Sequence, residues 1–297
     1  MHVRALPVAV AACAALVAVA ARADLLKDSP VNFPDKGALP GKFPPDVKTK
    51  SYPVEKDYSL FESPCRSPAQ IATIQAQMPK GRFTPPRNDW TGLQRTRRIL
   101  TEGGELHVLG LGDSIVNDTM RSGWIALLRE AYPKAKIRGT VYVRGGGGCQ
   151  HYREEGRVQK YLLPLKPDLV FIGGISQKDV ASIREVIRQL RAGLPDAEFL
   201  LASGPFGSAD PRDPDALARI KDPAGLTESL KRLAAEERCA FLDMRTPWIE
   251  YILSATVHPH LFYRDRVHAN ESGEQILAKI LMAFFRPEEP ANAAAVR

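Results

Sequence analysis

The chain has 297 residues, of which 44% are apolar and 25% charged, and its formal net charge is +7 at pH 7. This ordinary globular composition suits one domain of about 200 residues plus an appendage. No basic stripe is interleaved with aromatic residues, so nucleic acid is excluded as an expected partner. The positive excess fits an acidic polysaccharide, but it fits an ordinary solvated basic surface as well.

The first residues, MHVRALPVAVAACAALVAVAARA, run from Arg4 through an apolar stretch to Ala21-Arg22-Ala23. This order predicts a secretory signal peptide over residues 1–23, and therefore a secreted or periplasmic protein. A membrane anchor and a lipoprotein signal at Cys13 are the alternatives. Cleavage after Ala23 removes Arg4 and Arg22 and no acid, which lowers the net charge from +7 to +5. No later segment approaches the roughly 20 apolar residues that span a bilayer.

Cleavage would also leave three cysteines, Cys65, Cys149 and Cys239. An odd count permits at most one disulfide within the chain. None of the three belongs to a C-x-x-C pair, so we expect no structural zinc and no other metal.

Residues 24–103 form a predicted N-terminal extension. Up to about residue 60 it is rich in Pro, Lys and Asp without periodicity, which indicates a tether or a strap across the surface. Apolar residues then recur at helical spacing over 67–78 and 90–100. The main domain follows over 104–287, and residues 288–297 form a tail.

The main domain alternates short apolar runs with amphipathic segments. Strands are predicted at 106–111, 137–143, 169–172, 198–203 and 239–243, and helices at 118–131, 178–192, 227–237 and 271–285. Asn270 is a plausible N-cap for the last helix. Buried strands alternating with helices predict a parallel sheet covered on both faces. Functional groups in such sheets gather beyond the carboxyl ends of the strands, and Ser114 follows the first strand.

Two glycine-rich segments were compared with nucleotide-binding loops. The dinucleotide fingerprint requires G-x-G-x-x-G, but Gly110-Leu-Gly112-Asp-Ser-Ile115 lacks the third glycine. The cluster 145-GGGGCQ-150 ends in Gln150, and no G-K-[ST] loop is present. The sequence therefore predicts no nucleotide site.

The segment 265-DRVHAN-270 indicates a catalytic role for Ser114. A serine hydroxyl is a poor nucleophile at neutral pH and needs a base, usually a histidine oriented by a carboxylate. One loop carrying Asp265 and His268 can deliver both groups, with the final helix anchoring it. Read one at a time, these residues also fit a helix cap, a flexible loop and a surface ion pair.

Taken together, these segments resemble the SGNH (GDSL-like) hydrolase family over roughly residues 104–287. The resemblance lies in LGLGDSIVND, VRGGGGCQ and DRVHANESG. It implies an α/β fold, a three-layer α/β/α sandwich with a five-stranded parallel sheet, and no cofactor. It also implies Ser114, Asp265 and His268 as the catalytic triad. The amides of Ser114 and of Gly145, or of a neighbour in that cluster, would hold the oxyanion.

One block departs from the family pattern. The family usually has G-x-N-D after the third strand, where this chain has 171-FIGGISQKD-179. In that register Ser176 replaces the asparagine as the third oxyanion donor, and its hydroxyl can donate. We also expect Asp113, Gln177, His151 and Tyr152 to line the substrate site. Nearby Trp248, Tyr251 and Tyr263 suit either stacking on sugar rings or core packing.

The sequence thus predicts an exported serine esterase that removes small acyl groups, with acetyl favoured, from carbohydrate. Its partners would be a small ester or an acylated polysaccharide. Two alternatives remain: an O-acyltransferase that uses the same triad, and a catalytically silent glycan-binding protein on the same scaffold.

Overall fold

A central seven-stranded sheet organises the chain, in the order β1-β2-β4-β3-β5-β6-β7. In the computed structural model the described residues are 50–63, 66–154, 156–205, 210–215, 225–265 and 267–286, all within the compact unit Asp35–Arg297. The predicted signal peptide, Cys65 and the predicted tail lie outside these residues. The strands are β1 (Ser51–Tyr52), β2 (Tyr58–Glu62), β3 (Gly104–Gly112), β4 (Ala135–Arg144), β5 (Leu169–Ile172), β6 (Glu198–Ala202) and β7 (Ala240–Leu242).

The five predicted parallel strands are all present as β3 to β7, with boundaries within two residues of those expected. Their spatial order, β4-β3-β5-β6-β7, reverses direction at β3. Chain connections on the two sides of β3 therefore leave toward opposite faces of the sheet, and functional groups in such sheets gather beyond the carboxyl end of this strand. Ser114 begins the helix that leaves this end.

The prediction of a five-stranded sheet is wrong by two strands at one edge. β2 pairs antiparallel with β4 from Tyr58↔Arg144 to Glu62↔Thr140, and β1 pairs with β2. Residues 51–62 were predicted to belong to a tether or strap. They form strands because β4 supplies a hydrogen-bonding edge that lies some eighty residues further along the chain, and no local pattern announces such a partner.

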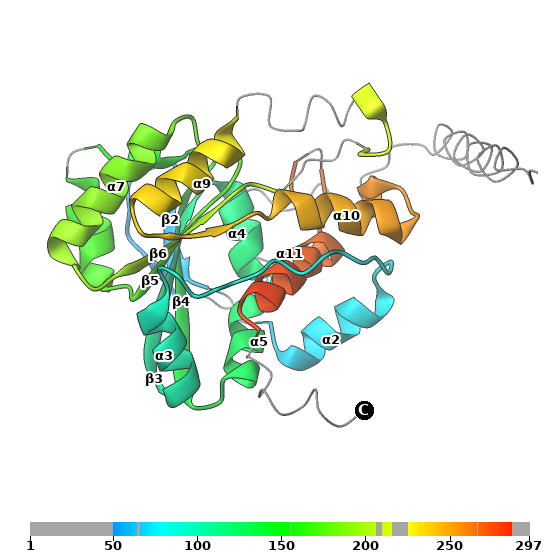
Figure 1. The fold of residues 1–297 in the computed structure, drawn as a ribbon, viewed down its shortest axis with the longest axis horizontal. Helices are drawn as coiled ribbons and strands as arrows, with labels where there is room; N and C mark the ends of the chain where they lie inside the picture. Colours follow the sequence, from blue (N-terminus) through cyan, green and yellow to red (C-terminus); the bar gives the residue numbers. More distant parts are fainter. Residues whose placement is uncertain are drawn as a thin grey trace, which may run out of the picture. The chain divides into compact units, whose positions relative to one another are not determined.

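Helices cover both faces of the sheet and produce the predicted three layers (Figure 1). Helices α7 and α9 pack on one face, where they share a buried cluster with β3, β5 and β6 that includes Leu109, Val170 and Leu201. Helices α4, α5 and α11 lie on the other face (Figure 1). The helices are α2 (Pro68–Gln77), α3 (Gln94–Glu102), α4 (Ser114–Arg121), α5 (Trp124–Ala131), α6 (Cys149–Tyr152), α7 (Val180–Gly193), α9 (Leu226–Glu236), α10 (Arg245–Ala255) and α11 (Glu271–Phe284), with single turns of other helix types at Val158–Leu162, Leu163–Leu165 and Pro259–Phe262.

Two helices depart from the sequence prediction and one cap agrees with it. The helix expected over 118–131 is divided into α4 and α5, because Gly123 adopts φ 84° and interrupts the helical backbone. Helix α10 was not predicted. Asn270 is the N-cap of α11, as expected, and its side chain accepts a hydrogen bond from the N–H of Gly273 at 3.1 Å. None of the described helices has the length and hydrophobicity needed to cross a bilayer.

Candidate active site

Three side chains from distant parts of the chain form a hydrogen-bonded array at the carboxyl end of β3. The hydroxyl of Ser114 lies 2.8 Å from Nε2 of His268, and Nδ1 of His268 lies 2.7 Å from Oδ2 of Asp265. An ionised carboxylate can only accept, so we assign the ring proton to Nδ1. Nε2 then carries a lone pair directed at the serine hydroxyl. This is the geometry of a nucleophile, its base and the group that orients the base.

Asp113 explains how the chain holds Ser114 in place. As the N-cap of α4, its Oδ1 accepts from the N–H groups of Ile115 at 2.9 Å and Val116 at 3.4 Å. Its Oδ2 accepts from Ile175 and Ser176, both at 2.8 Å. One fully buried carboxylate therefore joins the start of the serine helix to the loop that follows β5.

The loop before α11 orients His268 through Asp265. Oδ1 of Asp265 accepts from the backbone N–H groups of Val267 and His268, both at 2.8 Å, while Oδ2 receives the imidazole N–H. Partial burial acts to raise the pKa of Asp265, but these N–H groups and the His268 ring hold that pKa below its ordinary value. The carboxylate thus stays ionised at neutral pH and fixes the tautomer of the base.

The N–H of Ser114 is available to a further acceptor. It belongs to the first residue of α4, and the Asp113 side chain caps the two residues after it. Within the described part of the chain, no acceptor is recorded for this N–H. An unsatisfied amide at a helix N-terminus, beside a nucleophile, suits a developing oxyanion.

Within the glycine cluster, the contacts favour Gly148 over Gly145 as the residue that would supply the second oxyanion N–H. Gly145 is exposed, and nothing lies within 4 Å of where a β-carbon would stand. A β-carbon on Gly148 would lie 2.7 Å from the Ser176 carbonyl and from Oε1 of Gln177. Gly148 therefore packs directly against the loop that Asp113 holds, and only glycine fits there.

Ser176 lies in that loop as predicted, but Gln177 has a structural role. Oε1 of Gln177 accepts from the N–H of Cys149 at 2.9 Å, and Nε2 donates to the Gly173 carbonyl at 3.1 Å. The side chain of Gln177 is thereby used in joining the glycine cluster to the end of β5. Burial raises the pKa of the neighbouring Cys149 thiol to about 12, so that thiol stays neutral and is no competing nucleophile.

Three predictions of substrate contact are corrected by burial. Asp113 and Tyr152 are both completely buried, and Gln177 is nearly so. The hydroxyl of Tyr152 donates a hydrogen bond to the Gly112 carbonyl, and its ring packs against Tyr142. Tyr152 therefore stabilises the carboxyl end of β3 from within the core. These side chains shape the site without reaching its surface.

The nearby aromatic residues likewise belong to the core. Trp248, Tyr251 and Tyr263 are 2% exposed or less, and the first two lie on α10. Of the two roles left open for them, core packing is therefore the correct one. His151 remains partly exposed, and its Nε2 accepts from Arg144 at 2.8 Å. Partial burial, assisted by Arg144, lowers the pKa of His151.

A small apolar cavity adjoins the array. Its volume is about 10 Å³, enough for roughly one water or methyl group. Three of its lining residues, Ile115, Ile175 and Val267, are the direct sequence neighbours of Ser114, Ser176 and His268. Ile175 and Val267 are themselves exposed, so apolar surface continues from the cavity to the solvent.

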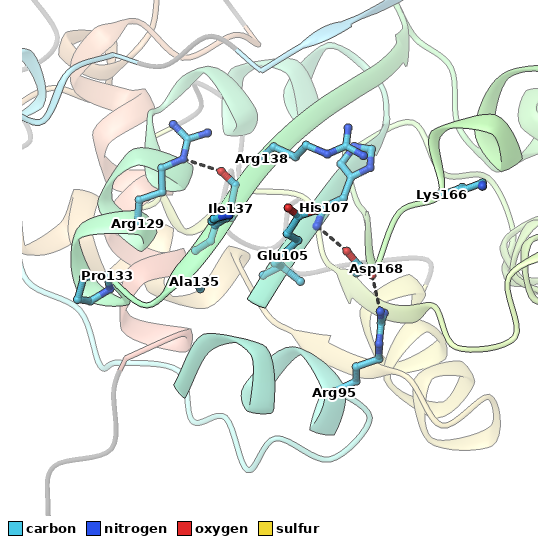
Figure 2. A pocket seen from close by; sticks show the side chains of 12 residues that line it. Arg95, Glu105, His107, Arg129, Pro133, Ala135, Ile137, Arg138, Lys166 and Asp168 are labelled. Atoms are coloured by element: carbon cyan, nitrogen blue, oxygen red, sulfur yellow. Dashed lines mark hydrogen bonds and ion pairs between the residues drawn. The ribbon is translucent and has the colours of Figure 1, made fainter. Parts of the chain in front are cut away.

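A much larger cavity of about 770 Å³ lies elsewhere, at the amino ends of β3 and β4 (Figure 2). Strands of this length place it roughly 25 Å from Ser114. His107 lies there, buried, with Nδ1 donating to the Leu165 carbonyl at 2.9 Å and Nε2 accepting from Thr140 at 2.7 Å. Both ring nitrogens of this histidine therefore have partners, at the end of the sheet opposite Ser114.

No metal-binding group is evident near the array. In the described ranges, no cluster of three or more His, Cys, Asp and Glu side chains is arranged to hold a metal ion. The recorded geometry instead offers a hydroxyl, an imidazole, a carboxylate and backbone N–H groups.

No family model matches the chain, and no curated protein matches it by sequence. Solved structures do. A catalytic mutant of Axe2, an acetylxylan esterase from Geobacillus stearothermophilus, aligns with a TM-score of 0.50 and 21% identity, over 62% of this chain and 95% of that one. A two-domain esterase (CEX) active on acetylated mannans aligns with a TM-score of 0.51 and 17% identity, over 70% of this chain and 58% of that one. At such identities the likeness concerns the fold alone, and it agrees with the three-layer α/β/α sandwich that the sequence motifs predict.

Proposed function

We propose that this protein is a serine esterase that removes O-acetyl groups from carbohydrate. The observation that carries the proposal is the continuous hydrogen-bonded array from Ser114 through His268 to Asp265. A purely glycan-binding protein would have no need of this array. The coarser assignment, a carboxylic ester hydrolase, rests on the array and the fold together.

The mechanism follows from where each proton lies. Nε2 of His268 takes the Ser114 proton as Oγ attacks the ester carbonyl, and Asp265 stabilises the imidazolium that results. We propose that the N–H groups of Ser114 and Gly148, with the Ser176 hydroxyl, receive the oxyanion. The imidazolium then protonates the leaving sugar hydroxyl. Water, activated by the same imidazole, releases the acid from the acyl-enzyme.

A short acyl group is favoured by the small cavity beside the array. Room for roughly one methyl group suits acetyl, whereas a longer chain would have to displace Ile175 or Val267. The sugar as leaving group is supported by the activities of the similar structures, an acetylxylan esterase and an esterase active on acetylated mannans.

We also propose that the protein acts outside the cytoplasm, after cleavage of residues 1–23. The order of charge, apolar run and small residues supports export. Sequencing the N-terminus of the protein recovered from the periplasm or culture medium tests this, with Asp24 as the expected first residue. Recovery of Met1 on exported protein contradicts it.

The enzymatic proposal is tested with p-nitrophenyl acetate and a panel of acetylated polysaccharides, by measuring freed p-nitrophenol and acetate. Ser114→Ala should lower kcat by ~10⁴-fold or more. Ser229→Ala, on the distant surface helix α9, is the matched control and should retain full activity. Acetyl transfer to an added oligosaccharide, in place of acetate release, would identify an acyltransferase. Glycan binding without turnover would identify a silent scaffold.

A further inference from the structure

A buried group of charged residues joins the serine helix to the histidine loop. Asp118 lies one turn beyond Ser114 on α4 and is completely inaccessible to solvent. Its Oδ1 lies 2.7 Å from a guanidinium nitrogen of Arg264, and its Oδ2 accepts from the N–H of Ala269 at 3.1 Å. Arg264 and Ala269 directly flank the segment that contains Asp265 and His268.

Asp118 therefore binds both ends of the loop that carries Asp265 and His268. The loop is also closed upon itself, because the N–H of Arg264 donates to the His268 carbonyl at 3.0 Å and the Arg264 guanidinium donates to the Ala269 carbonyl. A bridge between Tyr263 and Ala269 completes the closure. The loop is thus closed by its own hydrogen bonds, and the Asp118 carboxylate attaches both of its ends to α4.

Further charges surround this pair. Glu274 of α11 is 1% exposed and lies 3.6 Å from Arg121 and 3.9 Å from Arg264. On its other side, Glu274 pairs with Arg66 at 2.8 Å. Burial raises the pKa of Asp118 above its ordinary value; the Arg264 guanidinium opposes this shift, and the nearby Glu274 carboxylate adds to it. The Arg264 contact is therefore what favours the charged form of this carboxyl.

We propose that Asp118 and Arg264 are positioning residues, whose buried ion pair sets the His268 loop against α4 so that Nε2 stays within reach of Ser114. Apolar side chains could fill this space with equal or greater stability, since buried ion pairs are costly to desolvate. They could not hold two loop ends through directed hydrogen bonds. Because a misplacement of about 1 Å can reduce a rate by ~10²-fold, directional attachment matters here.

The first test is Asp118→Asn, which keeps the shape of the side chain. Its amide has one acceptor, so its NH₂ group must face either the Arg264 guanidinium or the Ala269 N–H, donor against donor. We expect kcat to fall by ~10²-fold with KM changed by less than about twofold, because Asp118 lines the small cavity beside Ile115 and the asparagine side chain keeps the shape of that wall. A kcat within about threefold of wild type overturns the proposal.

Two further variants separate positioning from stability. Arg66→Met removes a partner of buried Glu274 without touching the loop, so it should lower the melting temperature and leave kcat unchanged. The double variant Asp118→Leu with Arg264→Met should recover the melting temperature lost in Asp118→Asn, yet not its kcat. Recovery of kcat together with stability would show a merely structural role and overturn the proposal.

This inference rests on the proposed function, and a structural measurement keeps the two apart. Crystal structures of the wild type and of Asp118→Asn give the distance from Ser114 Oγ to His268 Nε2 without any turnover. We expect it to lengthen beyond 3.5 Å in the variant, and an unchanged distance contradicts positioning. If the wild type cleaves no ester, the esterase proposal is refuted. The comparison of the Ser114–His268 distance in the two crystal structures still decides whether Asp118 positions the loop.

Discussion

Asp113→Asn is the substitution for which the structure gives the sharpest expectation. The native carboxylate accepts four backbone N–H groups, two on each oxygen, within 2.8 to 3.4 Å. Asparagine offers one acceptor oxygen, so in either orientation its NH₂ group faces two N–H donors. Two charge-assisted hydrogen bonds are lost at about 1.5 kcal/mol each, the low end because they share one oxygen, or about 3 kcal/mol in all.

Urea unfolding measures the stability term, and p-nitrophenyl acetate turnover measures the catalytic one. With the loop of Ile175 and Ser176 released, we expect kcat to fall by ~10²-fold or more, the usual loss when an oxyanion donor is removed. Ser67→Ala removes a different N-cap, that of α2, and is the matched control. It should cost about 1 kcal/mol and leave kcat intact.

If Asp113 instead lined the substrate site, as its sequence position predicts, the effects on stability and on kinetics would be reversed. If this side chain touched substrate, Asp113→Asn would raise KM and leave the unfolding free energy nearly unchanged. A stability loss below about 1 kcal/mol would refute the account of Asp113 as a buried link, because a single lost charged hydrogen bond already exceeds that value.

Three further predictions concern other parts of the fold. Gly174→Ala places a β-carbon 2.3 Å from Oδ1 of Asp113 at φ 92°, so we expect a destabilisation of about 2 kcal/mol or more with lower kcat, and a wild-type melting temperature contradicts it. Asp265→Asn should lower kcat by up to ~10⁴-fold with little change in KM, because the His268 tautomer is no longer fixed; steady-state kinetics decide, and a loss below tenfold counts against the assignment. Burial lowers the pKa of His107 to about 4, so the folded state disfavours the protonated ring. The stability this provides is present above the unfolded pKa near 6.5 and is lost as pH falls toward 4. Between pH 7 and 4.5 the wild type should lose about 2 kcal/mol that His107→Gln keeps, as measured by urea unfolding; equal losses in both proteins exclude this origin.

The sequence predicts the parallel part of the sheet well because each strand is a short apolar run beside an amphipathic helix. Leu169–Ile172 agrees with the structure residue for residue, and Asn270 was recognisable as a cap from its chemistry alone. Helix α10 was missed although its buried residues, Trp248, Tyr251, Ile252 and Ala255, follow helical spacing. The aromatic side chains among them, Trp248 and Tyr251, also fit a sugar-stacking surface, and this interpretation competes with helical periodicity.

The site was only partly predictable, for a physical reason. Ser114, Asp265 and His268 belong to short motifs, so local sequence names them, and the structure brings them together. Their supports, such as Asp118 with Arg264, are pairings between residues far apart in sequence. The single local hint was that Asp118 stands four residues after Ser114, on the same face of a helix. Which partner such a carboxylate meets depends on the tertiary fold.

The antiparallel ribbon of β1 and β2 has a consequence for solubility. It pairs with Thr140–Arg144, the second half of the ten-residue β4, and leaves the two-residue β1 outermost. A version of the chain beginning at Gly104 would leave the outer edge of β4 unpaired. Such an exposed edge strand can pair with strands of other molecules and promote aggregation. The ribbon of β1 and β2 thus replaces part of a long exposed strand edge with a strand of only two residues.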